Sequence, residues 1–424
     1  MHIYFSGIGG VAIGPLALIC RDAGHTVSGS DLAESRFTEL MKQAGIDFTI
    51  GQDGSHIAAV HKKQPIDWLV ISSALPADHP EIAFAHQAGI KVTKRADMLN
   101  TILAQQKLKM IAVAGTHGKT TTTAMLVWLF MQCGVPVSYS VGTSFSFGPS
   151  GAYQPGSEYF VYECDEYDRN MLAFAPEFSL ITVVDYDHPD TYPTRAAYDQ
   201  AFIDFANRSQ QLNMWYDDAA RLNLENRCSQ LLDPAEPQLS HIRLAGAHNR
   251  ANAWQAVNAF NQLFPDWSID ELIEKINIFP GTDRRFERLA PNLYTDYAHH
   301  PGEIRATLQA ASELHDVVVA VYQPHQNLRQ HQIAGEYRDC FDQATHVYWL
   351  PTYLSREDPK LAVLTPEELI TQLDNPEVAE PADMNQALVE KIRSHLLRGE
   401  LVVCMGAGTL DAWIRAQLPK LTID

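Results

Sequence analysis

One strand, turn and helix constrain this chain more than any other feature. Residues 110–114 form a short apolar run typical of a strand in a parallel sheet, and a strongly apolar helix follows. Between them, Gly115 and Gly118 allow a sharp bend that brings backbone N–H groups close to an anion at the helix start. Lys119 then supplies a cation for phosphate, and Thr120 supplies a hydroxyl for Mg²⁺. Only two residues separate the glycines where the usual pattern has four, yet we predict a nucleoside triphosphate site rather than a purely structural turn.

The length and hydrophobicity of the chain define its broad class. A chain of 424 residues is too long for one core and indicates about two to four domains. Hydrophobic content of 46% and charged content of 20% are ordinary for a soluble globular protein, and no apolar run approaches the roughly 20 residues of a membrane span. Residues 1–20 lack the basic start and cleavage site of a secretory signal. We therefore expect a cytoplasmic protein without a membrane partner, and a monomer or weak homodimer.

Charge and cysteine content narrow the class further. Lys and Arg number 32 against 51 Asp and Glu, a net charge of −19, which disfavours a general nucleic-acid binder. The same net charge neither favours nor disfavours a nucleotide enzyme, because such enzymes concentrate positive charge in one cleft. The six cysteines are scattered without a CxxC pair, so we expect buried thiols in a reducing compartment.

The first segment reads as a dinucleotide-type strand and turn. Residues 2–5 form a strand that leads into the glycine-rich residues 6–14, of the form G-x-G-x-x-A. A second strand ends at Asp31, about where a carboxylate meets a ribose hydroxyl. Such a turn alone suggests NAD, although any nucleoside diphosphate could use it. With a further strand from Trp68 that runs into Ser72, the pattern predicts one small doubly wound domain up to about Gln105.

Polar clusters follow the next two strands of the second segment. The strand from Tyr159 ends in the carboxylates of residues 163–168, where an α/β nucleotide enzyme holds Mg²⁺, although a solvated acidic loop is the alternative. The strand at residues 179–184 ends in a second polar cluster that contains His188. A loop histidine is possible there. The convergence of three such strand ends on one crevice favours a metal ligand.

The third segment opens at a proline and glycine near residue 280. The tandem Arg284 and Arg285 suit phosphate or carboxylate clamping. Four later strands, starting near residues 293, 317, 347 and 401, each run into polar or glycine residues and indicate a third α/β domain. We find no internal repeat, and no low-complexity tract beyond an acidic, proline-containing loop near residues 375–382.

Taken together, these motifs resemble the Mur ligase family from residue 2 to about residue 408. The resemblance rests on ten ordered motifs more than on any one of them. They are the glycine turn near the start, Ser72-Ser-Ala, Lys94-Arg-Ala-Asp-Met-Leu, Gly115-Thr-His-Gly-Lys-Thr, Glu163-Cys-Asp-Glu-Tyr-Asp, Asp187-His, His248-Asn, Arg284-Arg-Phe, Asp296-Tyr-Ala-His-His-Pro and Gln323-Pro-His.

The resemblance implies an α/β protein with three domains and an amide-forming activity. The domains would be a Rossmann-like UDP-sugar-binding domain (1–106), a central P-loop-type ATP-binding domain with a mostly parallel sheet (107–280) and a Rossmann-like C-terminal domain that binds the amino acid (281–424). ATP would phosphorylate the lactyl carboxylate of UDP-N-acetylmuramic acid, and an amine, L-alanine first, would attack the acyl phosphate. This step would belong to peptidoglycan precursor synthesis.

The resemblance also implies a role for each matched residue. Lys119, Glu163 and His188 would be catalytic. One Mg²⁺ would be held by Thr120 and Glu163, and a second Mg²⁺ would lie near His188. ATP would contact Gly115, Thr116, His117, Gly118, Lys119, Thr120, Thr121, His248, Asn249, Arg285 and Asp296. The sugar nucleotide and the amino acid would contact Gly7, Ile8, Gly9, Gly10, Asp31, Ser72, Ser73, His299, His325 and Arg329. For His248 and Asn249, simple capping of a helix is the alternative.

One position departs from the pattern of the alanine-adding members of the family. They usually carry an arginine after Gln323-Pro-His, where this chain has Gln326, and Arg329 matches the second arginine of their pattern. A neutral glutamine cannot form a charge-assisted fork with a carboxylate, so we expect weak or relaxed amino-acid recognition carried mostly by Arg329.

Several alternatives remain open. A member that joins the tripeptide L-alanyl-γ-D-glutamyl-meso-diaminopimelate to the same sugar is the nearest, because residues 166–168 look like its acidic motif. A folate- or cyanophycin-type ligase should lack the first domain. An NAD-dependent oxidoreductase would leave Lys119 and Thr120 unused, and a nonhydrolysing nucleotide-binding scaffold would not need Glu163, His188 and the arginines together.

Overall fold

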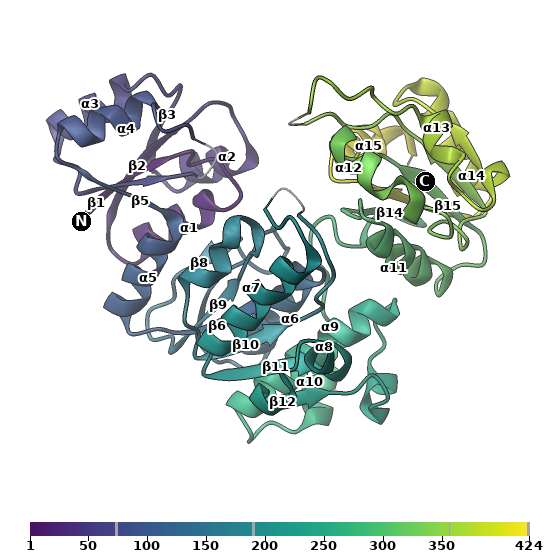
Figure 1. Ribbon diagram of the computed structural model, residues 1–424, viewed down its shortest axis with the longest axis horizontal. Helices are drawn as coiled ribbons and strands as arrows, with labels where there is room; N and C mark the ends of the chain where they lie inside the picture. The colour runs from purple at the N-terminus through teal and green to yellow at the C-terminus, as the bar shows by residue number, and fades with distance from the viewer. Residues whose placement is uncertain (73–74, 189–190, 356, 422–424) are drawn as a thin grey trace. The chain divides into compact units, whose positions relative to one another are not determined.

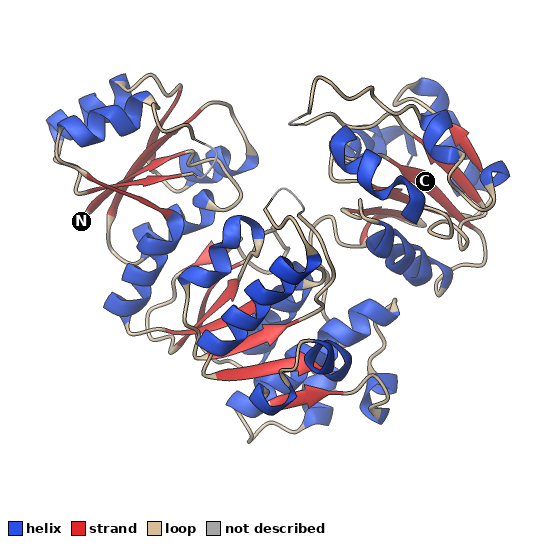
Figure 2. Cartoon of the chain, in the orientation of Figure 1, coloured by secondary structure: helices blue, strands red, loops and turns tan. Residues whose placement is uncertain are grey.

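The computed structural model describes residues 1–72, 75–188, 191–355 and 357–421 (Figure 1). The chain divides into two compact units. Unit 1 comprises Met1–Ile242 and Asn252–Phe279 and contains two sheets, whereas unit 2 comprises Arg243–Ala251 and Pro280–Asp424 and contains one. Helices cover the strands of each sheet (Figure 2). Among the described helices, none has both the length and the apolar character needed to cross a bilayer.

The first sheet of unit 1 is entirely parallel, with strand order β3-β2-β1-β4-β5. Side chains of β1 alternate between its faces, so Tyr4 packs with α3 and α4 while Ile3 and Phe5 pack with α1 and α5. The elements are β1 (His2–Ser6), α1 (Ile13–Asp22), β2 (Thr26–Asp31), α2 (Arg36–Gln43), β3 (Asp47–Ile50), α3 (Ser55–Lys63), β4 (Trp68–Ile71), α4 (Pro80–Gln87), β5 (Lys91–Lys94) and α5 (Arg95–Gln106).

The second sheet of unit 1 places the predicted phosphate strand between two neighbours that carry polar ends. Its order is β12-β11-β10-β6-β9-β7-β8, and β7 with β8 is its antiparallel pair. The elements are β6 (Lys109–Ala114), α6 (Lys119–Gln132), β7 (Val137–Ser140), β8 (Gly151–Ala152), β9 (Tyr159–Glu163), the 3₁₀ segment η1 (Tyr167–Ala173), β10 (Phe178–Ile181), α7 (Arg195–Arg208), β11 (Gln211–Trp215), α8 (Tyr216–Arg221), β12 (Gln230–Leu232), α9 (Ala247–Leu263) and α10 (Ile269–Ile276).

The sheet of unit 2 has the order β13-β14-β18-β15-β16-β17, with β13 antiparallel to β14 and the other pairs parallel. Alternate residues of β15 enter two apolar clusters: one contains residues of α11 and α12, the other residues of α14 and α15. The elements are β13 (Glu287–Ala290), β14 (Leu293–Asp296), α11 (Pro301–Ser312), β15 (Val318–Tyr322), α12 (Asn327–Ile333), β16 (His346–Trp349), α13 (Pro366–Ile370), β17 (Ala379–Pro381), α14 (Gln386–Leu397), β18 (Leu401–Met405) and α15 (Leu410–Leu421).

The expected α/β class with three mostly parallel sheets is confirmed. Two local expectations were wrong. The strand expected at residues 179–184 is β10, which ends at Ile181, and the loop expected near residues 375–382 contains the edge strand β17. The edge strand pairs with β16 through Ala379–Pro381, a segment too short and too polar to show a strand pattern.

Candidate active site

The turn between β6 and α6 requires glycine at both predicted positions. Gly115 has φ +138° and Gly118 has φ +82°. A Cβ at Gly115 would lie 2.0 Å from the Thr182 hydroxyl oxygen, and one at Gly118 would lie 2.5 Å from Asn252 Oδ1. The Thr182 hydroxyl donates to the carbonyl of His117 at 2.5 Å, so the segment that follows β10 supports the turn.

Thr116 fixes this turn rather than presenting its side chain to a ligand. Its N–H donates to Val183 O at 2.7 Å, and its hydroxyl donates to Asp185 O at 2.6 Å. The same hydroxyl lies 2.7 Å from the Tyr198 hydroxyl on α7. The predicted contact of Thr116 with ATP stays a prediction.

Lys119 lies against the turn and forms a buried ion pair. Its Nζ donates to Gly115 O at 2.6 Å and Thr116 O at 3.0 Å, and lies 2.8 Å from Glu166 Oε2. The Glu166 side chain is 1% exposed. Burial alone lowers the pKa of Lys119, but the carboxylates of Glu166, Asp165 and Glu163 together outweigh burial, and the pKa is raised. Likewise, burial alone raises the pKa of Glu166, but Lys119 and His188 together lower it, so the contacts favour the charged forms of both Lys119 and Glu166.

Glu166 also contacts His188 through its other carboxylate oxygen. His188 Nε2 lies 3.5 Å from Glu166 Oε1 and 3.7 Å from Asp187 Oδ2. Burial alone lowers the pKa of His188, and these carboxylates outweigh it and raise the pKa. Sequence reasoning placed Glu166 in the acidic cluster but did not include it in the site. The available signal was its position three residues after Glu163.

Thr120 and Glu163 meet as expected from adjacent strand ends. The Thr120 hydroxyl donates to Glu163 Oε1 at 2.8 Å, and Gly142 N–H donates to Oε2 at 2.6 Å. A hydroxyl and a carboxylate are hard oxygen donors that fit Mg²⁺, which usually takes one or two protein ligands with water and phosphate. In the described part of the chain, no group of three or more His, Cys, Asp or Glu side chains could hold a metal alone. His188 contacts Glu166 and Asp187, and its predicted role beside a second Mg²⁺ stays a prediction.

The glycine turn of the first sheet is closed by Asp31. The N–H groups of Gly7 and Ile8 both donate to Ser30 O at 2.9 Å, and Gly10 N–H donates to Gly7 O at 3.0 Å. Asp31 Oδ2 accepts from Gly9 N–H at 2.7 Å, so this carboxylate shapes the turn in addition to any ribose contact. Ser72 N–H donates to Ser6 O at 3.2 Å, and the predicted Ser73 lies outside the described residues.

Unit 2 brings one group of predicted ATP contacts together. Asp296 is 7% exposed and accepts from Phe286 N–H at 2.6 Å and Ala298 N–H at 2.7 Å. Burial raises the pKa of Asp296 to about 6, against the charge of Arg285. Burial lowers the pKa of His248 to about 4, and Arg285 adds to this effect. Asn249, in the first turn of α9, donates its side-chain amide to Ala245 O at 2.9 Å.

A second predicted group in unit 2 surrounds His299. Its ring centroid is 5.8 Å from that of His325, which stacks on Tyr353 at 5.6 Å. Burial lowers the pKa of His299 to about 4, and the charge of Arg329 adds to the shift, which places the arginine near the imidazole. The departing position, Gln326, has a strained backbone with φ +62° and ψ +116°. Such strain is typical of functional sites.

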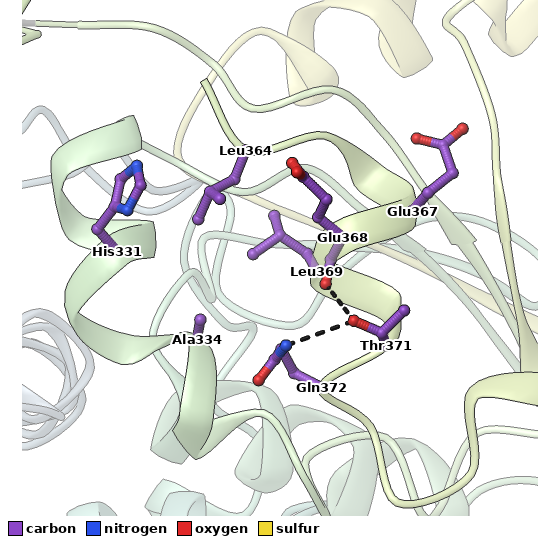
Figure 3. A pocket seen from close by; sticks show the side chains of 8 residues that line it. All are labelled: His331, Ala334, Leu364, Glu367, Glu368, Leu369, Thr371 and Gln372. Atoms are coloured by element: carbon purple, nitrogen blue, oxygen red, sulfur yellow. Dashed lines mark hydrogen bonds between the residues drawn. The ribbon is translucent and has the colours of Figure 1, made fainter. Parts of the chain in front are cut away.

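A separate hollow of about 540 Å³ lies between α12 and α13 (Figure 3). Both polar and apolar side chains line it, and the Thr371 hydroxyl donates to Glu368 O at 2.6 Å. None of its described lining residues belongs to the predicted site. They are His331, Ala334, Leu364, Glu367, Glu368, Leu369, Thr371 and Gln372.

These features define the class of protein to which the chain belongs. A parallel sheet carries a glycine turn, a lysine and an oxygen pair suited to Mg²⁺ at the start of α6, which is the arrangement of an α/β nucleotide-binding protein that acts on phosphate groups. Comparison with protein families identifies the class more narrowly. Residues 2–107 match the Mur ligase family catalytic domain, residues 113–233 the Mur ligase middle domain and residues 284–408 the Mur ligase glutamate ligase domain.

Related sequences align with this chain over nearly its full length. The UDP-N-acetylmuramate--L-alanine ligase of Gloeobacter violaceus is 31% identical over 99% of this chain and 97% of its own, and that of Desulfosudis oleivorans is 30% identical over 97% and 96%. The chain belongs to the Mur ligase family. Its fold is similar to that of the Thermotoga maritima UDP-N-acetylmuramate-alanine ligase, with TM-score 0.77 and 22% identity over 99% of each chain. The fold is also similar to that of the Psychrobacter arcticus murein peptide ligase, with TM-score 0.64 and 22% identity over 100% of each chain.

Proposed function

We propose that this chain is an ATP-dependent ligase of peptidoglycan precursor synthesis that joins L-alanine to UDP-N-acetylmuramic acid. The observation that carries the proposal is the meeting of Lys119, Glu166 and the Thr120–Glu163 pair at the carboxyl edge of β6 and β9. Full-length relatives named UDP-N-acetylmuramate--L-alanine ligase support the choice of substrates. Because a carboxylate is a poor electrophile, ATP first converts it to an acyl phosphate, and the amine then displaces phosphate to form the amide.

The residues of unit 1 have distinct roles in this reaction. Lys119 would exchange its contacts with the turn for the β- and γ-phosphates, and backbone N–H groups of residues 117–121 would add donors from the start of α6. Glu166 would keep Lys119 charged and hold His188 beside it. Thr120 and Glu163 would hold Mg²⁺, which neutralises phosphate charge when bound.

The three sheets suggest a division of labour. We assign residues 1–106 to the UDP-sugar, 107–280 to ATP and 281–424 to the amino acid, and we place the protein in the cytoplasm as a monomer or weak homodimer. In unit 2, His248, Asn249, Arg285 and Asp296 would contact ATP. His299, His325 and Arg329 would receive the amino acid.

A tripeptide is the alternative to L-alanine as the acceptor substrate. Gln326 stands where alanine-adding members usually carry an arginine, and the fold also resembles a murein peptide ligase. The deciding experiment measures kcat/KM for L-alanine and for L-alanyl-γ-D-glutamyl-meso-diaminopimelate by phosphate release, with UDP-N-acetylmuramic acid saturating. We expect preference for L-alanine. Preference for the tripeptide would replace the acceptor and leave the ligase chemistry standing, whereas no ATP-dependent product with either amine would overturn the proposal. A Lys119→Met protein controls for contaminating ATPase.

The metal assignment has its own test. Glu163→Gln and His188→Asn should each raise the Mg²⁺ concentration needed for half-maximal activity if both residues bind metal. Structural contacts favour the larger shift for Glu163, because it lies 2.8 Å from the Thr120 hydroxyl. Unchanged Mg²⁺ dependence in both proteins would show that they are loop residues without a metal role.

A further inference from the structure

Glu81 is a fully buried carboxyl group in the first sheet of unit 1. It is the second residue of α4, and the residue has no exposed surface. Its place in the first turn lets the helix dipole offset part of a negative charge. Among the residues that the structure describes, no lysine, arginine or histidine forms an ion pair with it. Because burial of an unpaired carboxylate is costly, its hydrogen bonds require an explanation.

Three hydroxyl groups converge on this carboxyl group. Tyr4 donates to Oε1 at 2.9 Å, Ser30 donates to Oε2 at 2.9 Å, and Ser6 also donates to Oε2. Burial, and then the charge of Glu81, raise the pKa of Tyr4, so this phenol remains a donor. Gln52, just beyond β3, donates its amide to both serine hydroxyls at 3.1 Å. One carboxyl group therefore connects the ends of β1 and β2 to the start of α4.

Through their backbone carbonyls, the same two serines hold the glycine turn and the segment after β4. Ser30 O accepts the N–H groups of both Gly7 and Ile8, and Ser6 O accepts the N–H of Ser72. Gly7 has φ +85°, and a Cβ there would lie 3.2 Å from Ser72 Cβ, so the turn and the segment after β4 are in close contact. A change in the position of Ser30 would reach the glycine turn, and a change in the position of Ser6 would reach the segment after β4.

We infer that Glu81 is a positioning residue for the nucleotide of the sugar substrate. By fixing the Ser6 and Ser30 side chains, it holds the glycine turn and the segment after β4 in the geometry that receives the nucleoside diphosphate. This inference rests on the proposed function, in which the first sheet binds that diphosphate.

The direction of the effect separates positioning from simple electrostatics. A negative charge beneath a diphosphate site repels the ligand, so removal of the charge alone would tighten binding. Positioning predicts the opposite. An ionised carboxylate accepts all three hydroxyl protons, whereas a glutamine amide must itself donate and leaves at least one hydroxyl without an acceptor. Removal of a buried unpaired charge can at the same time stabilise the fold.

The test is calorimetric titration of the full chain with UDP. In Glu81→Gln we expect the Kd for UDP to rise about tenfold, the size expected for one buried hydrogen bond to a charged group. The melting temperature should stay the same or rise, and ADP binding at the second sheet should not change. In turnover, KM for UDP-N-acetylmuramic acid should rise while kcat stays within about twofold.

Two further variants serve as a control and as a second test of the inference. Glu39→Gln removes an exposed carboxylate from the first turn of α2 and should leave UDP binding unchanged. Ser30→Ala removes one hydrogen-bond partner of Glu81 and leaves the carboxyl group in place, and it should also raise the Kd for UDP. If Glu81→Gln does not fold, Ser30→Ala takes its place as the test. Equal or tighter UDP binding in Glu81→Gln, or in Ser30→Ala when the former is unfolded, would overturn the inference. Failure of the wild-type chain to bind UDP would instead overturn the proposed role of the first sheet.

Discussion

Replacement of Lys119 should have two separable effects. From the sequence we expected that Lys119→Ala would leave the fold intact, because the side chain would face a ligand. In the structure Lys119 pairs with Glu166, whose side chain is 1% exposed, so we now expect the substitution to cost stability as well. Loss of the cation should reduce kcat by on the order of 10²-fold or more. It should also lower the free energy of unfolding by roughly 3–5 kcal/mol, because the buried Glu166 carboxylate loses its lysine partner.

A double substitution distinguishes the two effects. Lys119→Met combined with Glu166→Gln removes both charges, and should recover much of the stability in urea unfolding without recovering turnover. Asp168→Asn, an exposed position in the same acidic cluster, is the matched control. A fully stable Lys119→Ala protein would contradict a buried ion pair between Lys119 and Glu166.

Buried histidines of unit 2 should make its stability depend on pH. Burial lowers the pKa of His248 and of His299 to about 4, from 6.5. Between these values the unfolded chain binds more protons than the folded one, so stability is lost as pH falls from 6.5 towards 4. Asp296, with its pKa raised from 3.8 to about 6, acts in the opposite direction and offsets part of this loss below pH 6.

His248→Asn should therefore flatten the pH dependence of unfolding. The substitution removes up to one proton from the difference in bound protons between the unfolded and folded chains. That corresponds to a change in slope of about 1.4 kcal/mol per pH unit. The measurement is urea unfolding at pH 7, 6 and 5, and His331→Asn, at an exposed position of the same unit, is the control. An unchanged slope in His248→Asn would mean that the imidazole binds protons equally in the folded and unfolded states, which would contradict a lowered pKa.

At the scale of elements, the turn between β6 and α6 offers the sharpest test. Ala at position 115 would place its Cβ 2.0 Å from the Thr182 hydroxyl oxygen and about 3.1 Å from two backbone nitrogens, so the turn must move. Gly115→Ala should weaken ADP binding by more than tenfold. Gly134→Ala, beyond the other end of α6, has φ +68° and nothing within 4 Å, and should cost only about 1 kcal/mol of backbone strain with ADP binding retained. Equal ADP affinity in both proteins would show that the turn does not bind phosphate.

The arrangement of elements around this turn could be predicted because it depends on local pattern and parallel topology. Apolar runs located β6, β9 and β10, and parallel strands bring their carboxyl ends to one edge. The meeting of Thr120 with Glu163 followed from those two facts.

The inward orientation of Glu166 could not be predicted in the same way. The acidic segment offers four carboxylates, and its path turns where Asp168 and Arg169 adopt φ of 52° and 55°. Burial of Glu166 then depends on Lys119 and His188, which come from other parts of the chain. Glu81 was missed for the same reason, since its partners lie 51 to 77 residues away in sequence.

At the scale of the whole molecule, the sequence suggested three domains, whereas packing divides the chain into two compact units. One apolar cluster in unit 1 includes Leu16 and Leu99 of the first sheet's helices together with Phe160 and Tyr162 of β9. Unit 2 has apolar clusters of its own on the two faces of its sheet. Sequence pattern reveals sheets, but not whether two sheets share a core, because that depends on contacts between distant helices and strands.

The first two sheets should therefore unfold together. Polar contacts add to their shared cluster: Lys94 Nζ lies 2.9 Å from Asp168 Oδ2, and the Asn100 amide donates to Ala173 O at 3.0 Å. A chain of residues 1–279 should show one cooperative urea transition. Residues 107–279 alone should be far less stable, because the faces of β9 and η1 that meet α1 and α5 become exposed to water. Circular dichroism and urea unfolding of both chains measure this directly. Two separate transitions in residues 1–279, or equal stability of residues 107–279, would show that the first sheet is an independent folding unit.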